Sequence, residues 1–109
     1  MELWQQIENK QKKLDKAIKE LATNGYSRAE KEKIYKIELC KTALKLRDEG
    51  MPVTLINQVI YGYGDIPNLR FERDTAEVKY NANQEYINTI KLEIRILESQ
   101  LNREYTNVK

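Results

Sequence analysis

The chain has 109 residues, a net charge of only +2, no histidine and a single cysteine. The absence of histidine excludes Ser-His-Asp and Cys-His nucleophile systems and the common zinc sites, and one cysteine excludes an intrachain disulfide. The small net charge is far from the dense positive charge of a dedicated nucleic-acid-binding domain.

The composition predicts an all-α protein. Charged residues make up 33% of the chain, Gly and Pro are few, and the apolar residues recur at helical spacing. We predict a single helical domain over residues 1–109, with helices at about 2–22, 28–49, 54–61 and 67–105. They are expected to form an antiparallel helical hairpin, a short helical turn and one long coiled-coil-like helix that drives self-association. No membrane span, metal or cofactor is expected.

The first predicted helix, 2–22, has a stripe of residues spaced three and four apart. The stripe comprises Trp4, Ile7, Gln11, Leu14, Ile18 and Leu21. Gly25 is predicted to end the helix, because a glycine just past the last periodic residue suits a left-handed C-cap. Lys12, Lys16 and Lys19 lie on the opposite face. They form either a solvated surface or a stripe that contacts phosphates.

The second predicted helix, 28–49, begins at a capping box from Ser27 to Glu30, in which hydroxyl and carboxylate bind free backbone N–H groups. Its apolar face carries Ile34, Ile37, Cys40, Ala43, Leu44 and Leu46. Cys40 is interpreted as a small buried hydrophobe, since free cysteine is among the most buried residue types. The helix is predicted to end at Gly50, two residues before Pro52.

A short helix is predicted from Thr54, and it leads into a turn at residues 61–67 that is rich in Gly and Tyr. This segment lacks the G-K-[ST] sequence and the preceding strand of a phosphate-binding loop. Its glycines allow a sharp reversal, and Pro67 suits the first position of the long helix. Tyr61 and Tyr63 are either packing anchors or part of a contact surface.

The long predicted helix, 67–105, has apolar residues at heptad spacing: Leu69, Ala76, Tyr80, Ile87, Ile90, Ile94, Leu97 and Leu101. Arg73 and Asn83 interrupt this seam, and Arg73 is expected to face a pocket. Asn83 is predicted to fix the register of an oligomer seam that comprises Asn83, Ile87, Ile90, Ile94, Leu97 and Leu101. Leu92 and Ile96 lie off the seam, so we expect packing on two sides in a homo-oligomer, a dimer or higher.

No complete catalytic set is present, and we expect no enzyme. Glu72, Asp74 and Glu77 are close in sequence, but carboxylate metal sites in helical bundles normally include Glu-x-x-His elements, which this chain cannot form. Residues 46–60 are similar to the first half of a helix-turn-helix, but no basic recognition helix follows them. Nucleic-acid binding stays open, mainly because of the basic first half of the chain.

Two segments carry a resemblance to a known group of proteins. Residues 48–56 read DEGMPVTLI, and residues 68–80 read NLRFERDTAEVKY. With the Leu/Ile-rich tail that follows, the pattern over residues 40–105 resembles small phage and prophage proteins of Gram-positive bacteria. The resemblance implies a viral accessory protein in the cytoplasm of a bacterial host, encoded among early genes for DNA recombination or replication. It implies no active site.

The leading hypothesis is a non-enzymatic binding protein that acts on a host or phage protein of DNA metabolism or antiviral defence. Tyr61, Tyr63, Arg70 and Arg73 are the expected partner-binding residues, because aromatic and Arg side chains cluster beside the turn. One alternative is a nucleic-acid-binding protein that uses Lys12, Lys16 and Lys19. A second is an oligomeric sponge for a nucleotide signal near Arg70 and Arg73. An architectural role in a virion also stays open.

Overall fold

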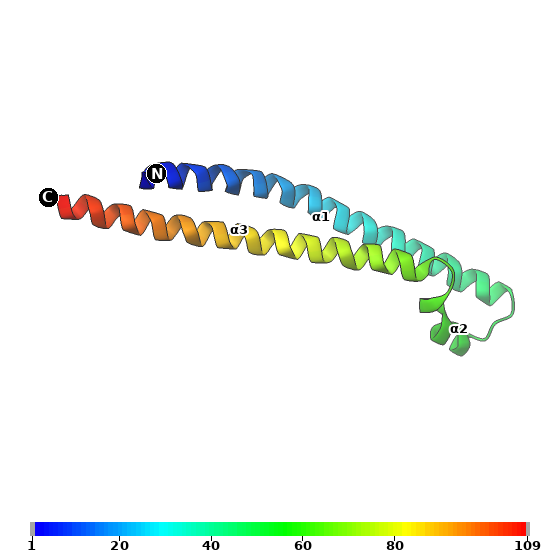
Figure 1. The fold of residues 1–109 in the computed structure, drawn as a ribbon. Helices are drawn as coiled ribbons and strands as arrows, with labels where there is room; N and C mark the ends of the chain where they lie inside the picture. Colours follow the sequence, from blue (N-terminus) through cyan, green and yellow to red (C-terminus); the bar gives the residue numbers. More distant parts are fainter. Residues whose placement is uncertain (1, 109) are drawn as a thin grey trace. The chain divides into compact units, whose positions relative to one another are not determined.

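The protein is described by a computed structural model over residues 2–108. Within these residues the elements are α1 (Leu3–Asp48), α2 (Val53–Val59), a short 3₁₀ helix η1 (Ile60–Gly62) and α3 (Ile66–Val108), and there is no strand (Figure 1). The all-α prediction and the prediction of a long C-terminal helix are therefore confirmed. The short predicted helix corresponds to α2 and η1 together.

The predicted interruption around Gly25 is wrong. One helix, α1, replaces the two predicted at 2–22 and 28–49, and Ser27 lies in its interior rather than at an N-cap. Among the described glycines only Gly50 and Gly64 have a positive φ, so Gly25 forms no left-handed cap. A glycine inside a helix costs about 1 kcal/mol relative to alanine, which a continuing packed face outweighs.

The chain divides into two compact units that share the long helices. Unit 1 holds Met1–Thr23 and Tyr80–Lys109, and unit 2 holds Asn24–Lys79. Each unit therefore contains a piece of α1 and a piece of α3, and α2 and η1 belong to unit 2. The prediction of a single domain stays a prediction.

The core of unit 1 is a narrow apolar seam between the two helix segments. Ile7, Ile90 and Ile94 are buried, and partly buried leucines pack against them: Leu14, Leu97 and Leu101. Lys10 contacts Glu93, and Ala17 contacts Asn83, so the segments run antiparallel. Only alternate members of the predicted first stripe face this seam. Trp4, Gln11 and Ile18 are exposed, since a pair of helices buries only a narrow stripe.

The core of unit 2 lies where α2 and η1 pack on the end of α1. Leu46, Ile56 and Ile60 are buried there, and the residues packed against them are Leu39, Ala43 and Met51. Because α2 covers this side of α1, Cys40 on another side is exposed, and the interpretation of Cys40 as a buried hydrophobe is wrong.

The end of α1 at Gly50 is confirmed. Gly50 has a φ of 92° and donates its N–H to the Arg47 carbonyl at 2.9 Å, and the Met51 N–H reaches the Leu46 carbonyl at 3.0 Å. These are the two hydrogen bonds of a Schellman cap, which satisfies the last carbonyls of a helix. The cap turns the chain toward α2. Among the described residues, no helix combines the length and apolarity needed to cross a bilayer.

Candidate functional site

The residues predicted to bind a partner separate into an exposed group and a covered residue. Tyr61 and Tyr63 are 49% and 38% exposed, and the Arg70 guanidinium lies 5.6 Å from the centre of the Tyr61 ring. We call Tyr61, Tyr63 and Arg70 the turn surface. Arg73 is not part of it, because only 21% of the Arg73 side chain is exposed.

Buried residues and backbone hydrogen bonds hold the turn surface in place. Ile60 before the turn and Ile66 after it are 5% and 0% exposed. The Tyr63 N–H donates to the Ile60 carbonyl, and the Ile66 N–H donates to the Tyr63 carbonyl, both at 3.1 Å. Gly64 has a φ of 55°, which permits the reversal between them. The tyrosines are therefore presented from a braced turn rather than a loose loop.

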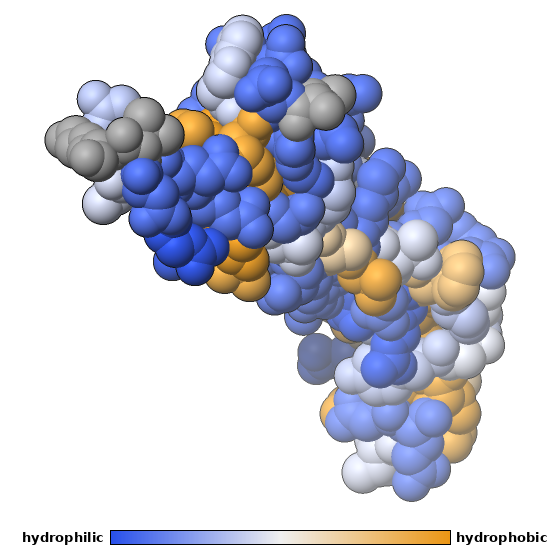
Figure 2. Space-filling model, turned by 60° about the vertical axis from the view of Figure 1, so that its left-hand side comes forward, coloured by the Kyte–Doolittle hydropathy of each residue, from blue (hydrophilic) through white to orange (hydrophobic). Residues whose placement is uncertain are grey.

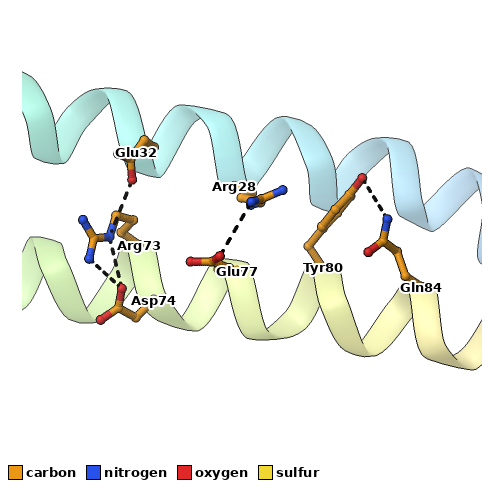
Figure 3. A network of polar contacts seen from close by, with 7 residues as sticks. All are labelled: Arg28, Glu32, Arg73, Asp74, Glu77, Tyr80 and Gln84. Carbon is orange, nitrogen blue, oxygen red and sulfur yellow. Dashed lines mark hydrogen bonds and ion pairs between the residues drawn. The ribbon is translucent and has the colours of Figure 1, made fainter.

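Arg73 faces α1 of the same chain. Its guanidinium lies 4.4 Å from the centre of the ring of Tyr35, which is 3% exposed. It donates to Asp74 Oδ1 from Nη2 at 2.9 Å and from Nε at 3.1 Å, and Nε is 3.5 Å from Glu32 (Figure 3). The hydrogen bonds to Asp74 are the largest cause that raises the pKa of Arg73, so this side chain keeps its charge.

The expected pocket at Arg73 exists as an open groove of about 500 Å³ within unit 2. It is lined by Gly25, Arg28, Ala29, Glu32, Arg73 and Glu77. Arg28 lies 3.6 Å from Glu77, and Arg73 lies 3.5 Å from Glu32, so each cation in the groove faces a carboxylate (Figure 3). A phosphate entering the groove would meet both carboxylates, which makes the groove a poor anion site. Arg73 lines the groove, whereas Arg70 lies over Tyr61 and is not among the lining residues.

Sequence reasoning missed Arg28 and Tyr35 as inward-facing residues. The predicted end at Gly25 hid a pattern that the sequence does contain. Ile7, Leu14 and Leu21 are spaced by seven residues, and the same spacing continues through Arg28 and Tyr35. An unbroken helix places all five on one face, so this heptad spacing was the signal that could have found Tyr35 opposite Arg73 and Arg28 opposite Glu77.

Replacing Arg73 with methionine tests the stacked ion-pair cluster. Methionine keeps much of the aliphatic stem but removes the cation over Tyr35. Glu32 and Asp74 are about half exposed, so their loss of a partner costs little. We expect a loss of about 1 kcal/mol in the free energy of unfolding, measured in urea by circular dichroism. The control, Arg70→Met at the exposed Tyr61, should lose less than about 0.5 kcal/mol. Equal losses would contradict the difference in environment.

Lys12, Lys16 and Lys19 all lie exposed on α1 in unit 1. None of them makes an ion pair within residues 2–108. Lys16 borders a shallow depression of about 260 Å³, together with Lys13, Ala17, Glu20 and Tyr86. The three cations are therefore accessible, although an acidic residue lies beside them.

The predicted oligomer seam is filled within one chain. Asn83, Ile87, Ile90 and Ile94 are buried in unit 1, and Leu97 and Leu101 pack against that core. The Asn83 side chain donates to the Ala17 carbonyl at 3.2 Å. Asn83 thus ties α3 to α1 rather than to another copy. Self-association stays a prediction, but it requires other residues.

Neither the metal-binding side chains of the described residues nor comparison with known proteins indicates a further site. In the described part of the chain, no group of three or more His, Cys, Asp or Glu side chains is placed to bind a metal ion. Comparison of the sequence and fold with protein-family models, curated proteins and solved structures found no match.

Proposed function

We propose that this chain is a non-enzymatic phage or prophage accessory protein that binds a host or phage protein of DNA metabolism or antiviral defence. The observation that carries the proposal is the turn surface. Two exposed tyrosines lie there on a turn between the buried Ile60 and Ile66, and the exposed Arg70 lies over the ring of Tyr61. The link to a phage rests on the sequence resemblance over residues 40–105.

The chemistry of the turn surface suits protein recognition. Tyr and Arg are enriched among the residues that contribute most to protein–protein binding, because they combine a large contact area with polar groups. A tyrosine loses little side-chain entropy when it is immobilised, and here the backbone is already fixed by the turn. Arg70 is also preoriented by the Tyr61 ring. A partner would therefore bind a prepared surface at a low cost in ordering.

Removing this surface should abolish partner binding. We expect the Tyr63→Ala, Arg70→Ala double variant to retain its helical content, because both side chains are exposed. It should lose at least about 100-fold in affinity for a protein captured by the wild type, as truncation of two hot-spot residues does. Binding is measured by pull-down from a Gram-positive host lysate after nuclease treatment, and then with the purified partner.

The matched control removes the same residue types elsewhere. Arg103 and Tyr105 are exposed near the end of α3, and Tyr105 is 70% exposed. The Arg103→Ala, Tyr105→Ala variant should bind the partner as the wild type does. If it loses binding equally, or if the turn variant folds and still binds, the turn surface is not the site.

Nucleic-acid binding is the second candidate, favoured by the accessible Lys12, Lys16 and Lys19. Such binding releases counterions, so its affinity should fall steeply as salt is raised. Replacing all three lysines with glutamine should remove it and reduce the salt dependence. If the wild type binds neither DNA nor RNA at low salt, this candidate is eliminated.

A further inference from the structure

Helix α1 carries an exposed apolar stripe in unit 2. Ile34, Ile37 and Leu44 are 38%, 44% and 54% exposed, although each is a large aliphatic residue. With Lys41 they are spaced three, four and three residues apart, which places them on one face of a helix. Glu30 begins the same face four residues before Ile34. We call Glu30, Ile34, Ile37, Lys41 and Leu44 the α1 stripe.

Two other faces of this part of α1 are covered. Tyr35 and Thr42 are buried at 3% and 8% exposure on one face. A second face, with Leu39, Ala43 and Leu46, is packed against α2 and η1. Ile34, Ile37 and Leu44 lie on neither covered face and so reach the surface. On the side of the molecule that Figure 2 draws, apolar patches interrupt a hydrophilic surface. A helix with a third apolar face is typical of a bundle with further helices.

We propose that a second copy of this chain docks on the α1 stripe, with the two α1 helices antiparallel about a two-fold axis. In a two-fold interface, residue i of one copy meets residue j of the other, and j meets i. Placing Ile34 opposite Ile37 of the second copy makes two apolar contacts at the centre. The same register places Glu30 opposite Lys41 of the second copy, also twice.

Charge selects this arrangement. Glu30 and Lys41 are exposed, and neither makes an ion pair within the described residues. A parallel, in-register pair would bring Lys41 against Lys41 and Glu30 against Glu30, which is repulsive. The antiparallel pair instead converts both unpaired charges into two intermolecular ion pairs. The stripe is thus complementary to itself in one orientation only.

Burying Ile34, Ile37 and Leu44 against a partner would remove their exposed apolar surface from water, which favours association. A second copy is available at the same concentration as the chain itself, so no other protein is needed to cover the stripe.

A charge reversal and its rescue test the proposal with the full chain. Sedimentation equilibrium should show a dimer for the wild type. Glu30→Lys and Lys41→Glu should each weaken dimerisation by at least about tenfold, because each places like charges at both ends of the contact. The double variant Glu30→Lys, Lys41→Glu should restore it. Lys19→Glu, an exposed charge change on α1 in unit 1, should leave the dimer unchanged.

Several results would overturn this dimer. One is a wild type that does not form dimers even at millimolar concentration, and another is that the single variants dimerise as the wild type does. Failure of the double variant to restore dimerisation would also contradict the proposal. Circular dichroism of each variant separates loss of dimer from loss of fold, and both substituted side chains are exposed. The test involves no binding partner, so it stands apart from the function proposed for the turn surface.

Discussion

Replacing Ile90 with alanine should destabilise unit 1 more than any surface substitution. Ile90 is 1% exposed and packs with Ile7 and Ile94 in the small apolar core of that unit. The substitution removes three carbon atoms and leaves a cavity between two helices. We expect a loss of about 3 kcal/mol in the free energy of unfolding, and a lower melting temperature, measured by circular dichroism. In so narrow a core this loss is expected to fray the helix ends of the unit.

Leu92 provides the matched control, because it lies two residues away on the same helix and is 54% exposed. Leu92→Ala should change the free energy of unfolding by less than about 1 kcal/mol, since little buried surface is lost. Similar losses for Ile90→Ala and Leu92→Ala would mean that the seam does not face α1 as the structure has it.

Leu46→Ala should release α2 and η1 from α1. Leu46 is 1% exposed and is the fully buried residue of α1 in the core that it forms with Ile56 and Ile60, with Leu39 and Ala43 of α1 packed beside it. A seven-residue helix such as α2 has no stability of its own and depends on this contact. We expect a loss of about 3 kcal/mol and faster amide hydrogen exchange across residues 53–62, measured by mass spectrometry.

This substitution links the core of unit 2 to the proposed function. Ile60 braces the turn that carries Tyr61 and Tyr63, so its release should also weaken partner binding, even though Leu46 is not on the surface. Val53→Ala is the control, since Val53 begins α2 but is 60% exposed. Unchanged exchange over 53–62 in Leu46→Ala would show that α2 is held by other contacts.

The sequence was sufficient to predict the inward face of α3. Asn83, Ile87, Ile90 and Ile94 repeat at heptad spacing, and every one is buried. Periodicity reports which face of a helix is covered, but it does not report what covers it. For this reason the seam was predicted to bind another copy, whereas α1 of the same chain fills it. A polar residue such as Asn83 fixes register equally well within a chain.

The path of α1 was harder to predict, because local and tertiary preferences disagree there. Gly25 and the Ser27-to-Glu30 pattern are genuine local stop and start signals, yet the packed face continues through them. The error at Gly25 then concealed Arg28 and Tyr35. Without Tyr35 on the inward face, Arg73 could be expected in a pocket but not assigned to Tyr35, Glu32 and Asp74.

The turn surface was predictable from composition, because aromatic and Arg side chains cluster beside the two glycines of the turn. The bracing of this turn was not predictable from the sequence, since only the structure shows that Ile60 and Ile66 are buried on either side of the tyrosines. The difference in surroundings between the exposed Arg70 and the covered Arg73 also became known only from the structure. Positions three residues apart share one side of a helix, so the spacing alone does not show that Arg70 lies exposed over Tyr61 while Arg73 packs over Tyr35 of α1.

Site-specific photo-crosslinking tests most directly whether the turn surface contacts a partner. A photoreactive phenylalanine derivative is placed at Tyr63 and, as the control, at the exposed Ser99 of α3, and each protein is irradiated in host lysate after nuclease treatment. We predict a discrete protein adduct at position 63, absent at position 99 and suppressed by Arg70→Ala. No adduct at position 63, or the same adducts at both positions, would contradict a binding role for the turn surface.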